Sequence, residues 1–256
     1  MKATALEYRL RYLLHAILYA LGFTAPWNYA LHLDPSGANA HVWGLLAVNM
    51  SQVRIATLST AFNVLLLLGI FCALAAAGLR TWGSAYLGND VVQDGGMHVP
   101  MSPTPFAGDQ RPEVLTAGPY RHLRNPLYVG TLLHTFALAL LMPRSGAIFA
   151  IVAASVLQVR LILAEESYLM AKIGEPYRTY CANVPRLLPR VRASIPSSGQ
   201  SARWPQALLG ESYMWIVALS MAIAGWRYNA SLLIQCVLVA FGVSLVVRAF
   251  APKPAE

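Results

Sequence analysis

Two short polar clusters carry the side chains of this sequence that could do chemistry. The first, GPYRHLRNPLYVG (residues 118–130), stands directly before an apolar run that continues to Met142. The second, AEESYLMAKIGEPYRTYCANVPRLLP (residues 164–189), begins where another apolar run ends, at Glu165 and Glu166. Charged groups at membrane depth are costly and indicate a functional site. An arginine fork suits a carboxylate and a glutamate suits ammonium or hydroxyl groups, so binding of a small charged molecule is one of two open interpretations of the pattern.

A purely structural explanation of these charges stays open. Arg124 paired with Glu165 or Glu166 would form a salt bridge that only fixes two helices. Arg121 could be an anchor at the membrane boundary, and His122 is more typical of a solvated side chain than of a catalyst. Similar explanations apply to the later polar groups: the interfacial aromatic belt for Tyr177 and Tyr180, and glutamate pairing or lipid headgroup contact for Arg186.

The composition identifies a membrane protein. Of the 256 residues, 57% are hydrophobic and 12% are charged, and the mean hydropathy is +0.50. A soluble domain normally carries about 25% charged residues. Two of the three cysteines lie in apolar segments and the spacing fits neither a disulfide framework nor a metal site. We therefore expect an integral membrane protein without a metal.

Six apolar segments are long enough, or nearly so, to cross the hydrocarbon layer as helices. They are residues 12–31, 61–79, 126–142, 145–164, 206–226 and 229–247. A seventh stretch, 41–59, is interrupted by polar residues, and we expect an interfacial helix or a re-entrant segment there. The sequence predicts an all-α, polytopic transmembrane helix bundle of about six spans.

The distribution of positive charge predicts the orientation. With the N-terminus inside, 15 of the 19 Lys and Arg residues lie on the cytoplasmic side. Both termini and both polar clusters are then cytoplasmic, so we expect a cofactor pocket at that face, in a cell inner membrane. A basic face beside anionic membrane lipid also accounts for the net charge of +8 without a nucleic-acid partner.

Short and long connections organise these elements. The turn at residues 142–146 is so short that the third and fourth spans must form an antiparallel hairpin, which brings the two polar clusters to one pocket. The Gly- and Pro-rich residues 93–118 are expected to form an irregular loop, with a lid as one possible role. The expected divisions are N-terminal membrane helices at 1–77, a core at 78–190, and a linker with a C-terminal transmembrane hairpin at 191–256.

The two clusters, with GLRTWGSAYLG (residues 78–88) upstream, resemble the integral membrane methyltransferases that include isoprenylcysteine carboxyl methyltransferase and the phospholipid N-methyltransferases. The resemblance covers about Gly78 to Arg190, and the two-part pattern at hairpin spacing is specific. It implies S-adenosylmethionine as the cofactor, held between the motifs at the cytoplasmic surface. By position, the arginine, histidine, proline, tyrosine and glycine of the first motif and the glutamate pair of the second correspond to Arg124, Asn125, Pro126, Tyr128, Gly130, Glu165 and Glu166.

The resemblance implies roles for these residues. The expected cofactor contacts are Tyr120, Arg124, Asn125, Pro126, Tyr128, Gly130, Glu165 and Glu166, and the expected catalytic residues are Arg124, Tyr128 and Glu165. Asn125 departs from the family pattern, in which many members carry histidine, and this puts in doubt any role that needs a titrating imidazole. Gly130 would let a ligand approach the helix backbone closely.

Methyl transfer from a sulfonium mainly requires in-line positioning at ~3–3.5 Å and the exclusion of water. The expected acceptor is lipophilic or embedded in the bilayer, and either a carboxylate or an amine would serve. Two other classes remain: a small transporter whose path includes Arg160 and Gln158, although six spans without detectable halves fit this poorly, and a structural membrane subunit. No Walker loop, HExxH or GxSxG motif supports an ATPase, a metalloprotease or a hydrolase.

Overall fold

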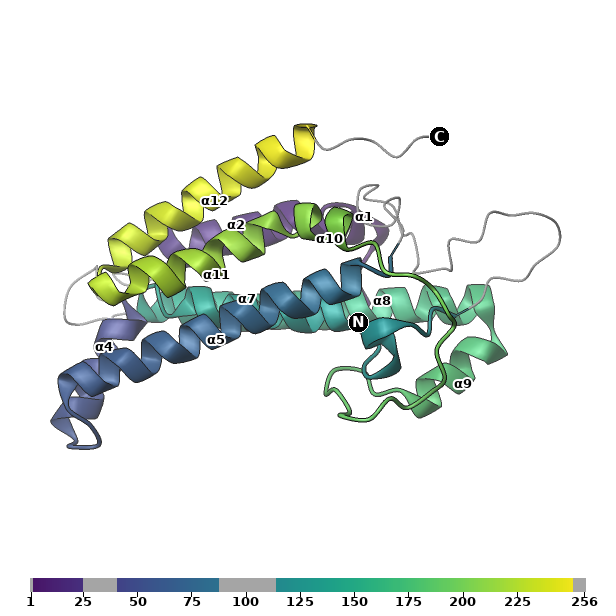
Figure 1. Ribbon diagram of the computed structural model, residues 1–256, viewed down its shortest axis with the longest axis horizontal. Helices are drawn as coiled ribbons and strands as arrows, with labels where there is room; N and C mark the ends of the chain where they lie inside the picture. Colours follow the sequence, from purple (N-terminus) through teal and green to yellow (C-terminus); the bar gives the residue numbers. More distant parts are fainter. Residues whose placement is uncertain (1, 25–40, 88–113, 251–256) are drawn as a thin grey trace.

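A computed structural model of the chain describes residues 2–24, 41–87 and 114–250 (Figure 1). The regular elements in these ranges are helices, which confirms the all-α prediction. Three helices are long and apolar enough to cross a membrane: α5 (Leu58–Ser84), α8 (Arg144–Ile173) and α12 (Ala230–Phe250). A fourth candidate span is the pair α10 (Trp204–Gly210) and α11 (Ser212–Ala224), which bends by 69° where the two helices meet.

Two of the six expected spans are not identified as spans within the described ranges. Helix α2 (Arg11–Thr24) reaches the limit of a described range, so the end of the expected segment 12–31 lies outside the described residues. Helix α7 (Pro126–Ala139) has 14 residues, or about 21 Å at 1.5 Å per residue, less than the ~30 Å hydrocarbon layer. The described ranges therefore identify three or four spans, and the count of six stays a prediction.

Helix α7 occupies the centre of the bundle, between α5 and α8. Small side chains allow α5 to approach α7 closely, and Ala73, Ala76 and Ala77 are completely buried on α5. A short turn after α7 leads through Pro143 into α8, which packs back against α7. This arrangement confirms the predicted antiparallel hairpin.

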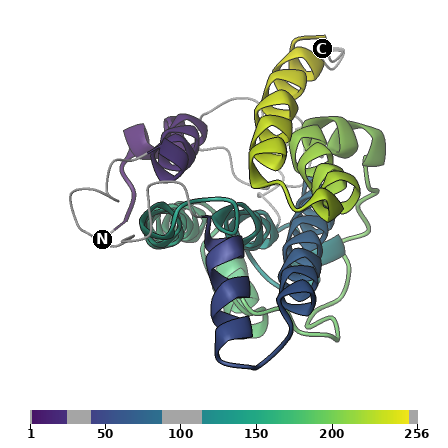
Figure 2. The ribbon, with the colours of Figure 1, turned by 90° about the vertical axis from the view of Figure 1, so that its left-hand side faces the viewer.

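The outer helices form two groups. Helices α1 (Ala5–Arg9) and α2 follow one another along the surface of α8, whereas α11 packs against α5 and α12 packs against α11. Figure 2 shows α2 and α12 on the same side of the central helices with space between them. The N-terminal and C-terminal groups therefore face each other on one side of α7.

The interrupted stretch 41–59 forms α4 (Val42–Gln52), a helix of 11 residues that packs against the start of α5. The buried Trp43 fastens it, because its ring nitrogen donates to the Phe62 carbonyl at 3.1 Å. The helix is too short to cross a membrane, which agrees with the interfacial or re-entrant expectation. The chain turns at Arg54 (φ 59°) before Thr57 caps α5.

Shorter helices and loops cover one end of the bundle. The chain passes through the 3-10 helix η1 (Gly118–Arg121) into α7, whose first residue, Pro126, has the fixed φ suited to that position. Helix α8 stops at Gly174 (φ 76°), a conformation that glycine adopts without strain, and α9 (Glu175–Asn183) follows. Of the expected loop 93–118, residues 93–113 lie outside the described residues. A second 3-10 helix, η2 (Gly225–Arg227), lies in the connection between α11 and α12.

Candidate functional site

Glu166 joins the two polar clusters. Its carboxylate accepts hydrogen bonds from Asn125 at 3.2 Å and from the Arg186 guanidinium at 2.7 Å, and it pairs with Arg124 at 3.3 Å. The same chain segments also meet through the backbone, because Arg124 N–H donates to the Pro185 carbonyl at 2.9 Å. The predicted meeting of the clusters is therefore confirmed. Of the two roles expected for Arg186, glutamate pairing and lipid headgroup contact, the structure shows glutamate pairing.

Glu165 faces a different environment from its neighbour. Its Oε2 atom accepts a hydrogen bond from the Tyr128 hydroxyl at 2.7 Å and a long one from the Tyr8 hydroxyl at 3.5 Å. No Lys or Arg side chain of the described residues forms an ion pair with it. Its carboxylate therefore retains the capacity to bind an ammonium group or hydroxyl groups.

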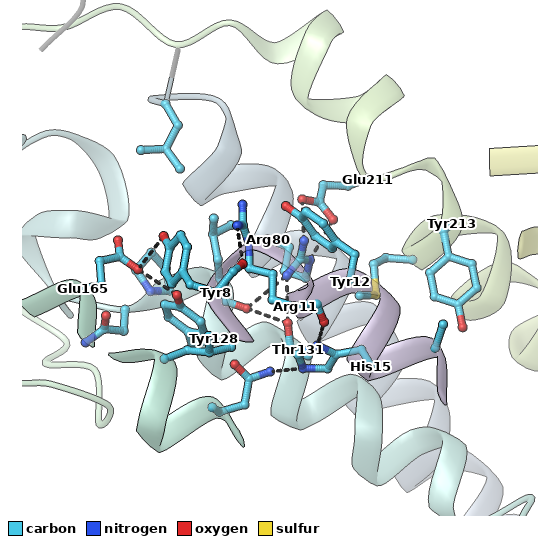
Figure 3. Close-up of a pocket in the computed structure, with 18 of the residues that line it drawn as sticks. Tyr8, Arg11, Tyr12, His15, Arg80, Tyr128, Thr131, Glu165, Glu211 and Tyr213 are labelled. Carbon is cyan, nitrogen blue, oxygen red and sulfur yellow. Dashed lines mark hydrogen bonds and ion pairs between the residues drawn. The ribbon is translucent and has the colours of Figure 1, made fainter. Parts of the chain in front are cut away.

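A cavity of about 640 Å³ lies between the N-terminal and C-terminal helices, over α7. This volume is typical of small-molecule sites. Figure 3 shows Glu165, Tyr8 and Tyr128 at one side of it, and Arg80 with Glu211 close by. The polar lining residues include Tyr8, Arg11, Tyr12, His15, Arg80, Tyr120, Arg124, Asn125, Tyr128, Thr131, Gln158, Glu165 and Glu211. We call the part around Arg11, Arg80, Tyr128, Glu165 and Glu211 the polar end.

The opposite part of the cavity is hydrophobic and will be called the apolar end. Its lining includes Ala20 and Phe23 from α2, Leu138 from α7, and Ile234 and Val237 from α12. Because α2 carries Arg11 at its start and Phe23 near its end, the cavity changes from polar to apolar along this helix. Such a gradient suits a ligand with a polar head and an apolar chain.

Most of the predicted cofactor residues line the cavity, but Glu166 and Gly130 do not. Those that line the cavity are Tyr120, Arg124, Asn125, Pro126, Tyr128 and Glu165. Glu166 is 8% exposed and is engaged by the clusters instead. Gly130 is also outside the lining. A Cβ atom there would meet the Arg80 side chain and, at 3.1 Å, the Ala76 carbonyl. Gly130 thus permits the close approach of α5, not of a ligand.

Tyr177 and Tyr180 are placed differently from the sequence expectation. Both are buried, at 4% and 6% exposure, and both line the cavity, whereas rings of the interfacial aromatic belt would lie at the outer surface of the bundle. Burial raises the pKa of the Tyr180 phenol, which stays neutral and donates to the Tyr120 carbonyl at 2.9 Å. By contrast, His122 is outside the lining and contacts the Arg190 carbonyl.

Sequence reasoning missed the pair Arg80 and Glu211. Arg80 binds both carboxylate oxygens of Glu211, at 2.7 and 2.9 Å, and also donates to the Thr131 hydroxyl at 2.7 Å. Ser84 donates to the same carboxylate at 2.9 Å, and Glu211 is 3% exposed. A signal was present, because Glu211 is the single acidic residue in the apolar stretch 204–250. An isolated charge in such a stretch indicates a buried partner.

Arg160 and Gln158, the residues that a transport path would use, both contact side chains of the N-terminal helices. Arg160 lies outside the cavity lining and forms an ion pair with Glu7 at 2.7 Å, which ties α1 to α8. Gln158 lines the cavity and its amide nitrogen lies 2.9 Å from the His15 Nε2 atom. These contacts hold the N-terminal helices in place, and no observation here favours transport.

Comparison with known proteins identifies one family. Residues 64–175 match the phospholipid methyltransferase family. No curated protein and no solved structure matches the chain. The matched segment contains the cluster before α7 and the two glutamates of α8, but it includes neither α2 nor the C-terminal helices that complete the cavity.

Proposed function

We propose that this chain, whose residues 64–175 match the phospholipid methyltransferase family, transfers a methyl group from S-adenosylmethionine to an amphiphilic acceptor taken from the bilayer. The observation that carries the proposal is a single cavity in which Tyr128 and Glu165 of the matched segment share a wall with the apolar surfaces of α2 and α12. A charged donor and a lipophilic acceptor can meet only in a site of this mixed character.

The residues of the polar end fit the donor. S-adenosylmethionine supplies a methyl group already activated on a positively charged sulfur. Glu165 has no paired cation among the described residues and can accept hydrogen bonds from the ammonium group or the ribose hydroxyls. The ring of Tyr128 can face the sulfonium through a cation–π contact. Arg124 lines the cavity, and its Nε atom is buried without a hydrogen-bond partner among the described residues, which leaves one donor for the ligand.

The apolar end fits a long hydrocarbon chain. Phe23, Leu138 and Val237 line it from three different helices. Each buried methylene group contributes about 0.8 kcal/mol to binding, so a chain of lipid length would be held without polar contacts. The acceptor is therefore a lipophilic or membrane-embedded molecule, and membrane lipid is the source.

The reaction asks little further of the protein. A carboxylate acceptor is ionised at neutral pH and attacks as it stands. An amine must first lose a proton, and Glu165 is the carboxylate that could take it. Orientation and a water-poor cavity supply the remaining rate enhancement. We place the polar end at the cytoplasmic face of a cell inner membrane, on the strength of the Lys and Arg distribution.

Methyl-labelled S-adenosylmethionine tests this function. Protein in lipid nanodiscs is incubated with the labelled donor and a total lipid extract, and the lipid classes are then separated. We expect label in one lipid fraction, and we expect Glu165→Gln to lower its rate by about 10- to 100-fold through lost donor binding. Glu175→Gln is the matched control, because Glu175 is an exposed glutamate near the end of the same hairpin (71% exposed).

Two outcomes would overturn the proposal. One is wild-type protein that neither binds the donor nor labels any lipid. The other is equal loss of labelling in both glutamate variants, because a surface residue would then matter as much as the cavity residue.

A further inference from the structure

Arg11 differs from the other arginines of the cavity. Three arginines line it, from α2, α5 and the segment before α7. Arg80 is paired with Glu211 and Arg124 is paired with Glu166. Arg11 has no carboxylate partner among the described residues. A guanidinium that lines a cavity and forms no ion pair is available to a negatively charged group of a ligand.

The local structure holds the Arg11 side chain in place. Its NH1 atom donates to the Tyr8 carbonyl at 2.9 Å, and the guanidinium carbon lies 4.6 Å from the ring centres of both Tyr8 and Tyr12. Stacking occupies the faces of the planar group and leaves its edge, where the N–H bonds point, for a ligand. The segment is itself fastened, because Thr4 caps α1 and Glu7 pairs with Arg160.

Glu165 supplies the complementary charge nearby. Figure 3 shows Arg11 beside Tyr8, whose hydroxyl contacts Glu165. No ion pair joins Arg11 to Glu165, so each group is available to a different part of a ligand. A molecule with a negative and a positive group a few bonds apart, such as an amino acid, would satisfy both.

We propose that Arg11 binds a carboxylate at the polar end of the cavity. This inference rests on the proposed function and deepens it. The carboxylate has two possible sources: the methionyl end of the donor, whose ammonium group would lie at Glu165, or the head of an amphiphilic acceptor. In both cases a residue outside the matched segment 64–175 determines which ligands the cavity accepts.

The experiment compares ligands that differ only in the carboxylate. Protein in nanodiscs is titrated with S-adenosylhomocysteine and with its decarboxylated analogue, and separately with radiolabelled oleate and oleyl alcohol. We expect Arg11→Gln to weaken binding of the carboxylate-bearing member of one pair by about tenfold or more, and to leave the other member unchanged. Arg11→Lys, which keeps the charge and loses the planar fork, should retain part of the preference.

Arg9→Gln is the matched control. Arg9 is exposed and outside the cavity lining, so its loss removes the same charge from the same segment. We expect it to leave all four affinities unchanged. Thermal unfolding of each variant identifies any that fail to fold, and Arg11→Lys then serves in place of Arg11→Gln.

The two ligand pairs separate the possible results. If Arg11→Gln weakens binding of S-adenosylhomocysteine but not of its decarboxylated analogue, the donor is the source of the carboxylate. If it weakens binding of oleate but not of oleyl alcohol, the acceptor is the source. If Arg11→Gln changes both members of each pair equally, or changes none, the proposal is overturned. If wild-type protein binds neither S-adenosylhomocysteine nor its decarboxylated analogue, the proposed donor is refuted. The comparison of oleate with oleyl alcohol then tests by itself whether Arg11 binds a carboxylate. Wild-type protein that binds no carboxylate overturns both.

Discussion

At the residue scale, the two neighbouring glutamates of α8 have separate environments. Successive residues of a helix point about 100° apart, so Glu165 faces the cavity while Glu166 faces Arg124, Arg186 and Asn125. The family resemblance assigns both to the cofactor. The contacts divide the pair into a group that faces the cavity and a group that joins the two motifs.

This division predicts different effects of the same substitution. Glu166→Gln leaves two arginines without a counter-ion and should lower the free energy of unfolding by roughly 2–3 kcal/mol. The estimate is modest because the Arg186 side chain is 47% exposed and therefore screened. Denaturant unfolding in detergent measures it. Glu165→Gln should cost much less stability, because Tyr128 can still donate to the amide oxygen, and equal destabilisation by both variants would contradict the division.

At the element scale, the bent pair of helices α10 and α11 connects the C-terminal group to α5. The bend between α10 and α11 places Glu211 against α5, where it binds Arg80 and Ser84. Arg80 in turn contacts Thr131 of α7. The C-terminal group is thus coupled to the wall of the cavity through one buried carboxylate.

Removal of this carboxylate should loosen three helices together. Glu211→Ala leaves a buried guanidinium unpaired and should lower the free energy of unfolding by about 3–5 kcal/mol. The double variant Arg80→Met with Glu211→Leu removes both charges and should recover most of that loss, because well-packed apolar groups often replace buried pairs without cost. Thermal unfolding of Arg80→Met, Glu211→Leu and the double variant measures the coupling. Additive losses would show that the pair does not act as a unit.

At the scale of the whole molecule, the cavity is an assembly of distant segments. Helix α2 forms one wall, α12 forms the other, and the hairpin of α7 and α8 supplies the motif residues between them. The family match covers only part of this assembly. The matched segment carries Tyr128 and Glu165, which we propose bind the donor, and the flanking helices supply Ala20, Phe23, Ile234 and Val237 at the apolar end.

A larger side chain in the apolar end should therefore act on the acceptor alone. Ala20→Phe fills space between α2 and α12, far along the helix from Arg11, and we expect a several-fold rise in KM for a long-chain acceptor with unchanged affinity for S-adenosylhomocysteine. Leu21→Phe, one residue on, is the control, because Leu21 is 39% exposed and outside the lining. Methylation kinetics give the KM for the acceptor, and calorimetry gives the affinity for S-adenosylhomocysteine. A fall in donor affinity would place the donor, not the acceptor, at this end.

Sequence alone determined the features that depend on local pattern and chain length. The hydropathy of α5, α8 and α12 predicted membrane helices, and the short turn at 142–146 required the hairpin that brings Asn125 to Glu166. Sequence could not determine which helices from the two ends of the chain line the cavity over α7, because long connections leave that arrangement free. Only the tertiary structure therefore showed that Gly130 lies against Arg80, that Glu211 reaches α5, and that Arg11 shares a cavity with Glu165.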